Sequence, residues 1–146
     1  MTPDRRFEWG GLSAGRADFV TAAEALATLE GLVDAYSDLA PATGVSDGDA
    51  FVRFSVGERW AVVSTPGTRW FSVRVDSGHR ARLDDATSTR AEAAMLLHTY
   101  VAIGAAYVRG EAVAEDGRLM VTAAGRRVSL TRPFVERLRG WMRERR

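Results

Sequence analysis

The chain has 146 residues, of which 46% are hydrophobic and 27% charged, and its formal net charge is +1. These values are typical of a soluble globular protein, and they predict a single domain over residues 1–146 with enough chain to bury a core. The absence of cysteine excludes a disulfide framework, a thiolate zinc site and a cysteine nucleophile. No basic segment followed by an apolar one opens the chain, so we expect no signal peptide and a cytoplasmic location.

Arginine supplies all 20 basic residues, and the chain has no Lys, Asn or Gln. This usage indicates a GC-rich genome, such as that of an actinobacterium. Residues 126–146 hold eight Arg and two Glu, a local charge of +6, which leaves −5 for the rest because the total is +1. The basic end could contact nucleic acid, an anionic membrane or an acidic protein, or it could pack on the acidic body of its own domain.

The first predicted helix spans residues 22–39. Thr21 and Glu24 form a capping-box pattern, and apolar residues follow at steps of three and four. Asp34 and Asp38 lie one turn apart, but no histidine or third ligand accompanies them, so we interpret them as a solvated face rather than a metal site. Pro41 ends the helix, and we expect residues 44–49 to be a turn-rich linker.

A β-meander is predicted over residues 51–75. Strands 51–56 and 59–64 flank Gly57-Glu58, a two-residue hairpin loop. That loop predicts the opposed pairs Val52–Val63 and Phe54–Ala61 on a core face, and Arg53–Val62 and Ser55–Trp60 on a mixed face.

The third predicted strand, residues 69–75, follows a turn signature at residues 65–68. A tight turn would place Trp70 on the core face, whereas a longer loop would place Phe71 and Val73 there, because a slip of one residue reverses the faces. Both alternatives are open. Residues 79–83 form a plausible fourth strand, whose Arg80 and Arg82 indicate an exposed face or an edge.

The central helix is predicted from Arg90 to Arg109. Thr89 and Glu92 form a second capping box, and Gly110 follows the apolar run where a left-handed residue ends many helices. The helix is apolar nearly all round, so we expect it to be buried on more than one side. A membrane span is the alternative, but the run is shorter than the ~20 apolar residues that a span needs.

Small residues at steps of four mark one stripe of this helix: Ala94, His98, Ala102 and Ala106. We expect the stripe to pack closely inside the monomer rather than form a dimer seam. His98 is then interpreted as a core histidine with one hydrogen bond, and a general base or pH switch is the alternative.

Two short strands, residues 118–122 and 126–130, follow the central helix. Thr131 caps a predicted last helix, with Pro133 in its first turn and arginines around its polar face. No catalytic motif, metal-ligand spacing or cofactor motif is recognisable, so we expect no enzyme activity, no metal and no cofactor.

Arginine and tryptophan residues alternate across the meander, and both types are frequent hot spots at protein interfaces. The candidate binding residues are Arg53, Trp60, Arg69, Trp70 and Arg74, with Arg139 and Arg143 of the basic last helix. The alternative is that these are half-buried strand residues covered by long arginine stems.

The order of elements resembles that of the type III secretion chaperone and YbjN-like group of small α+β proteins. The residues that carry the resemblance are the helix from Leu26 to Tyr36, the run from Asp47 to Phe54 and the two aromatic strands that follow. The resemblance implies a non-enzymatic, often dimeric protein that binds a peptide or partner protein. Small actinobacterial immunity proteins are a second resemblance of the same class.

We therefore predict an α+β fold, with an antiparallel β-meander, a long buried central helix and flanking N- and C-terminal helices. The predicted function is binding of another protein or peptide, with a homodimer as one open arrangement. The alternative is a small-molecule-binding or enzymatic domain with a pocket between sheet and helices. Its lining residues would be Tyr36, Trp60, Trp70, His98 and Tyr100.

Overall fold

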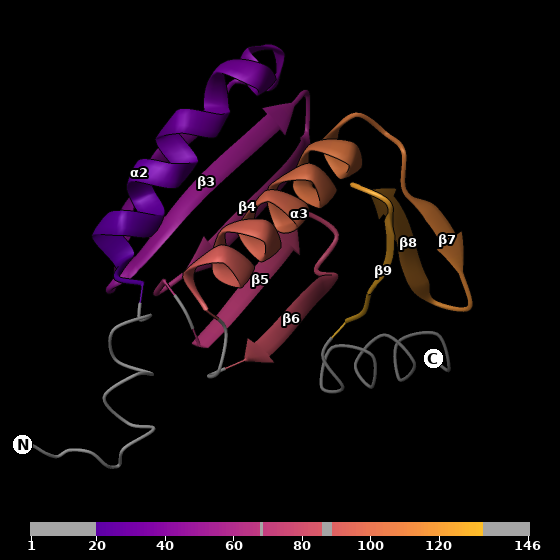
Figure 1. Cartoon of the computed structure of the whole chain (residues 1–146). Helices are drawn as coiled ribbons and strands as arrows, with labels where there is room; N and C mark the ends of the chain where they lie inside the picture. The colour runs from indigo at the N-terminus through magenta and orange to yellow at the C-terminus, as the bar shows by residue number, and fades with distance from the viewer. Residues whose placement is uncertain (1–19, 68, 86–88, 133–146) are drawn as a thin grey trace, which may run out of the picture.

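An antiparallel sheet of five strands carries two α-helices on one face in the computed structural model, which describes residues 20–67, 69–85 and 89–132 (Figure 1). The strands follow one another in chain order as β2 (Ala42–Ser46), β3 (Asp49–Val56), β4 (Arg59–Thr65), β5 (Arg69–Val75) and β6 (Arg80–Asp85). The helices are α2 (Ala22–Leu32) and α3 (Arg90–Val108). The protein therefore has an α+β fold built on an antiparallel meander.

The first helix is shorter than predicted. The Thr21–Glu24 capping box is present and starts α2, but Val33–Leu39 forms a 3-10 helix, η1, with a kink at Tyr36 (φ −122°, ψ 27°). The prediction of one α-helix over residues 22–39 is therefore wrong in its second half. The tighter turn accompanies packing of the Tyr36 ring against Phe54, with ring centroids 5.3 Å apart.

Strand β2 occupies part of the segment that was predicted to be a linker. Asp47 and Gly48 both have positive φ, 52° and 84°, and form a two-residue hairpin loop that pairs β2 with β3. The linker prediction is therefore wrong for residues 44–46 and 49, which are in strands, whereas the predicted turn is present at Asp47-Gly48. Gly44, a weak strand former, lies opposite Phe51, whose ring atoms come within 3.1 Å of the position that a Cβ of residue 44 would take.

The register of the meander agrees with the hairpin prediction. Val52 pairs with Val63, Phe54 with Ala61, Arg53 with Val62 and Ser55 with Trp60. Between β4 and β5 the longer loop is present, so Phe71, Val73 and Val75 are buried on the core face and Trp70 lies on the other. The predicted fourth strand is β6, which begins after His79.

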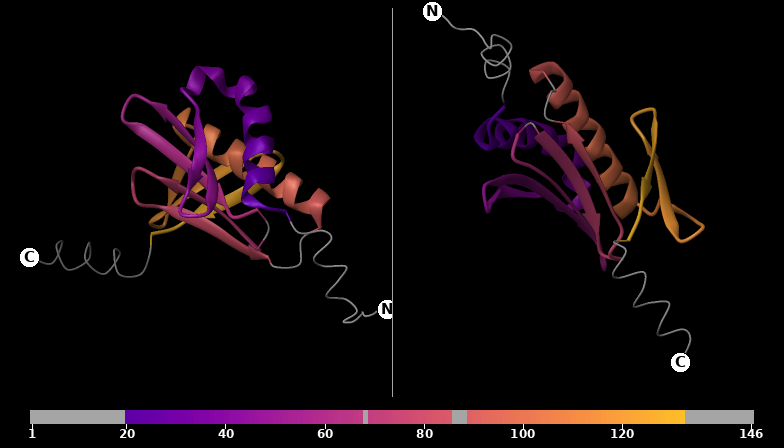
Figure 2. Two further views of the ribbon diagram at one scale, coloured as in Figure 1. Left: turned by 90° about the vertical axis from the view of Figure 1, so that its left-hand side faces the viewer. Right: turned by 90° about the horizontal axis from the view of Figure 1, so that it is seen from below.

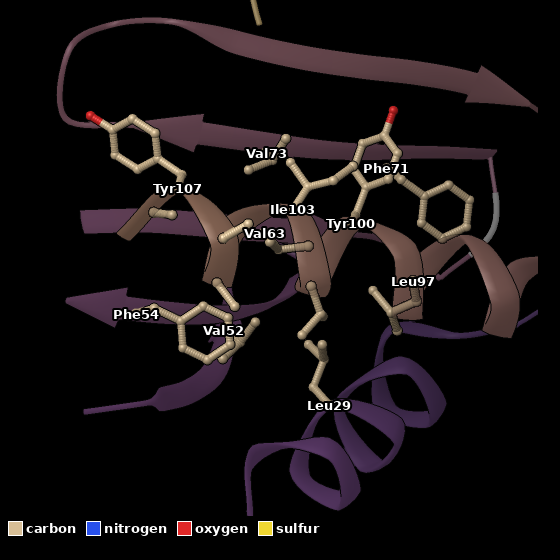
Figure 3. Close-up of a cluster of buried hydrophobic side chains, with 14 of the residues drawn as sticks. Leu29, Val52, Phe54, Val63, Phe71, Val73, Leu97, Tyr100, Ile103 and Tyr107 are labelled. Atoms are coloured by element: carbon tan, nitrogen blue, oxygen red, sulfur yellow. The ribbon is translucent and has the colours of Figure 1, made fainter. Parts of the chain in front are cut away.

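Helix α3 is the centre of the core. The Thr89–Glu92 capping box begins it, and Gly110 (φ 83°) follows its end, as predicted. Gly104 allows close approach to the sheet, since a Cβ there would lie 3.1 Å from Val63 Cγ2. Buried side chains of α3 meet those of α2 and the sheet in one cluster (Figure 3). Burial of this kind is the main source of the free energy of folding.

One side of the N-terminal half of α3 faces solvent. Ala94 and His98 are exposed, and Met95 is 62% exposed, whereas Ala106 is buried. The predicted packing of the stripe inside the monomer is therefore wrong for Ala94 and His98, and His98 is not a core histidine. The reason is that the second sheet described below covers only the later turns of the helix (Figures 1 and 2).

Helix α3 is long and apolar enough to cross a membrane by length and composition alone. In its most apolar window 61% of the residues are buried inside the protein. A core helix of a soluble protein meets the same description.

A second, three-stranded sheet follows α3: β7 (Val113–Glu115), β8 (Arg118–Ala123) and β9 (Arg126–Leu130). Strands β8 and β9 match the predicted strands, and β7 was not predicted. Val121 and Leu130 are buried in the common core. A backbone bridge between Thr131 and Arg80, with two hydrogen bonds of 2.8 Å, ties this sheet to β6. The predicted C-terminal helix, with Arg139 and Arg143, lies outside the described residues.

Candidate functional site

The candidate site is the face of the five-stranded sheet that points away from α2 and α3, which we call the open face. Figure 2 shows both helices on the opposite side of the sheet. Within the described ranges no helix or strand packs on this face. Strand alternation assigns the following described side chains to it: Ala42, Ser46, Asp49, Phe51, Arg53, Ser55, Trp60, Val62, Ser64, Trp70, Ser72, Arg74, Arg80 and Arg82.

The strand register arranges these side chains in rows that cross the sheet. One row holds Arg53, Val62, Arg74 and Arg80. The next row holds Phe51, Ser64, Ser72 and Arg82. The Oγ atoms of Ser64 and Ser72 are hydrogen-bonded at 3.0 Å in the middle of the face. Arg74 and Arg80 are direct cross-strand partners, so two like-charged side chains start from neighbouring positions on backbones about 5 Å apart.

Each tryptophan of the open face lies beside an arginine. Arg53 Cζ is 5.4 Å from the centroid of the Trp60 ring, and Arg82 Cζ is 4.6 Å from that of Trp70. These distances are within the range of cation–π attraction. The contacts hold the guanidinium groups against the rings and limit the entropy they would lose on binding a partner.

Two hollows lie next to each other on this side of the protein, and Arg74 lines both. The larger has a volume of about 350 Å³ and is lined by Ser46, Asp47, Asp49, Phe51, Arg53, Val62, Ser64 and Arg74. The smaller, about 200 Å³, is lined by Trp60, Arg74, Val75, Asp76, Gly78, His79 and Arg80. The open face therefore has a hollow on either side of Arg74.

Unneutralised positive charge dominates the centre of the open face. Among the described residues no salt bridge is formed by Arg53, Arg74 or Arg80. At one end, burial and the neighbouring Asp47 carboxylate raise the pKa of Asp49, while Arg82 lowers it in part. The face therefore runs from acidic at the β2–β3 turn to basic at β5 and β6.

Four of the predicted binding residues come together on the open face: Arg53, Trp60, Trp70 and Arg74. Arg69 does not join them, because it alternates with Trp70 and begins β5 with a positive φ of 83°. Sequence reasoning did not assign Phe51, Arg80 and Arg82 to the site. The alternation of Arg80 and Arg82 with apolar residues did predict an exposed strand. It did not indicate which residues of other strands would lie beside these two arginines.

The residues predicted to line a pocket between sheet and helices do not meet. Tyr36 packs on Phe54, and Tyr100 is buried with its ring centroid 6.4 Å from that of Phe71. His98 is exposed on α3, and the two tryptophans lie on the open face. Residues 20–67, 69–85 and 89–132 also contain no group of three or more His, Asp or Glu that could hold a metal ion.

His79 makes two polar contacts that were not predicted from the sequence. It is only 8% exposed, with Nδ1 2.7 Å from Ser77 Oγ and Nε2 3.3 Å from the Gly117 carbonyl oxygen. Because a carbonyl oxygen only accepts, the proton belongs on Nε2, and Nδ1 accepts from the Ser77 hydroxyl. The imidazole thus links the β5–β6 turn to the β7–β8 turn.

Comparison with known proteins places no family, function or fold relative beside this chain: no family model, no curated protein and no solved structure matches it.

Proposed function

We propose that this protein is a non-enzymatic binding domain that takes a partner protein on its open face, in a chaperone-like or immunity-protein-like role in the cytoplasm. The observation that carries the proposal is the grouping of two tryptophans and four arginines on a sheet face that no described element covers. Tryptophan and arginine contribute most of the binding energy at many protein interfaces.

The degree of burial supports the proposal. Trp60 and Trp70 are half-buried, so each already has one side supported by the sheet and needs little ordering to bind. The Ser64–Ser72 hydrogen bond gives each of these two central hydroxyls a partner within the sheet, which lowers the cost of desolvating them. The hollows on both sides of Arg74 can accommodate side chains of a partner.

We propose that Arg139 and Arg143, which lie outside the described residues, also contribute to partner binding. A homodimer is compatible with binding on the open face, provided that the two copies meet through another surface.

Site-directed photocrosslinking tests the function. A benzoylphenylalanine in place of Ser55, at the margin of the open face, should form an adduct with one protein in cells that naturally produce the chain. The same group in place of Met95, exposed on α3, is the matched control and should not. Trp70→Ala in the Ser55 variant should reduce the adduct, since loss of such a side chain costs ~2 kcal/mol of binding at a hot spot.

Equal labelling from both positions, or adducts with nucleic acid only, would contradict the proposal. A thermal unfolding curve of the Trp70→Ala variant distinguishes loss of binding from loss of folding.

A further inference from the structure

Among the described residues, nothing offsets the electrostatic cost of pairing Arg74 with Arg80. Like charges that are directly opposite on neighbouring strands destabilise a sheet. Both side chains are exposed, and no described carboxylate forms a salt bridge with either of them. By contrast, Arg90, Arg109 and Arg127 pair with Glu24, Asp38 and Glu115 on other surfaces.

We propose that the open face recognises an acidic segment of its partner protein, whose carboxylates pair with Arg74 and Arg80; this inference rests on the proposed function. A guanidinium presents a planar fork of N–H donors that fits a carboxylate with two parallel hydrogen bonds. Arg53 can do the same while it stays against Trp60, because a ring covers the flat side of a guanidinium and leaves its edge accessible.

Charge disfavours three other occupants of this face. A second copy would bring its own arginine row against the first, and like charges would meet. The C-terminal end of the chain carries eight Arg and two Glu over residues 126–146, so it is repelled as well. Residues 1–19 carry three Arg and three acidic residues, which leaves no net negative charge to neutralise the row.

A nucleic acid fits less well than an acidic protein segment, for two reasons. Asp47 and Asp49 line the larger hollow together with Arg53 and Arg74, and they repel a uniformly charged polyanion. A base that stacks on Trp60 or Trp70 also competes with the arginine already there. A protein segment can place carboxylates at Arg74 and Arg80 and neutral or basic residues beside the aspartates.

The test measures binding of three fluorescein-labelled probes to the full chain by fluorescence anisotropy. The probes are a short peptide rich in Glu and Leu, the same peptide with Gln in place of each Glu, and an oligothymidylate with the formal charge of the first peptide. We expect the acidic peptide to bind the most tightly and the Gln peptide not to bind.

The variant Arg74→Gln/Arg80→Gln should weaken binding of the acidic peptide about tenfold or more, as expected for loss of hydrogen bonds to charged groups. The matched control is Arg118→Gln/Arg126→Gln, which removes the same two charges from exposed positions of the second sheet. Its affinity should stay within about twofold of the wild-type value, because neither side chain belongs to the open face.

Equal losses in the two double variants would overturn the inference, because binding would then follow net charge alone. Tighter binding of the oligothymidylate would assign the face to nucleic acid. A protein adduct at Ser55 without binding of the acidic peptide would reject the acidic segment and leave the proposed function standing. Binding of the acidic peptide without any protein adduct would contradict the proposed function and leave the recognition of acidic segments standing.

Discussion

Gly67 shows how one residue supports the packing of distant segments. It lies in the loop between β4 and β5, has a φ of 131° and is buried. A Cβ at this position would be 1.9 Å from the carbonyl oxygen of Val20, just before α2. The hydroxyl of the buried Thr65 accepts from the Gly67 amide at 3.0 Å and donates to the Trp70 carbonyl at 2.6 Å. The loop therefore fits under the start of α2 only without a side chain.

We predict that Gly67→Ala lowers the free energy of unfolding by about 2 kcal/mol or more, because it combines backbone strain with steric overlap. Gly31→Ala is the control: it is in α2, nothing lies within 4 Å of its Cβ position, and the change should stabilise by up to ~1 kcal/mol. Urea unfolding of both variants measures the difference. A neutral Gly67→Ala variant would show that the loop can move away from Val20.

Single residues were the scale at which sequence reasoning was least complete. The open-face positions of Arg53, Trp60 and Arg74 follow from strand alternation and one hairpin loop, and these were predicted. The exposure of His98 depends on which turns of α3 the second sheet covers. The burial of His79 depends on a carbonyl 38 residues further along the chain. Neither is encoded in a local pattern.

At the scale of elements, α2 and α3 are joined by an ion pair at their N-terminal ends. Glu24 accepts from Arg90 Nη1 at 2.6 Å and also closes the capping box of α2. The hydrogen bond from Arg90 and that from the Thr21 backbone lower the pKa of Glu24 from 4.5 to about 2. Since the pKa is lowered in the folded state, the stabilisation is complete above the unfolded value and is lost as the pH falls toward 2.

We predict that Glu24→Gln lowers the melting temperature near neutral pH and that the difference from wild type shrinks as the pH falls from about 5 toward 2. Gln can still close the capping box, so the variant removes mainly the charge. Because the pair is exposed, the effect should be small and should decrease with added salt. A difference that does not change with pH would mean that the charge of Glu24 contributes nothing.

Elements whose boundaries are set by local chemistry were predicted well. Capping boxes begin both α-helices, and the Gly57-Glu58 loop sets the β3–β4 register. Strand β2 was missed because Gly44 is a poor strand former, and the Asp47-Gly48 pair was interpreted as part of a linker. The 3-10 segment η1 was missed because its apolar spacing also fits an α-helix. Tertiary packing decided both cases.

At the scale of the whole molecule, the two sheets are joined at few points near β6. One is the backbone bridge between Arg80 and Thr131, and another is the hydrogen bond of His79 to Gly117. The Arg80 side chain belongs to the open face, while its backbone holds β9. The edge of the second sheet is thus continuous with the proposed binding surface.

We predict that His79→Phe, which keeps a ring but removes both hydrogen bonds, speeds amide hydrogen exchange in β7 and β8 while β3 and β4 stay unchanged. The loss in stability should be about 2 kcal/mol, because each of the two hydrogen bonds contributes about 1 kcal/mol. Ser77→Ala is the matched control, because it removes the Nδ1 partner and leaves the bond to Gly117. Equal exchange rates in wild type and His79→Phe would show that the imidazole does not hold the second sheet.

The opposition of Arg74 and Arg80 makes dissolved salt act in two directions on this protein. In the free protein, ions screen the two neighbouring cations from each other and so reduce the repulsion that destabilises the sheet. In the complex, the same ions screen the cations from the partner's carboxylates and weaken the contact. Because such close charges are separated by less than the screening length of about 8 Å at physiological ionic strength, salt weakens both interactions only in part. Lower ionic strength therefore decreases the stability of the free protein and increases its affinity for the partner.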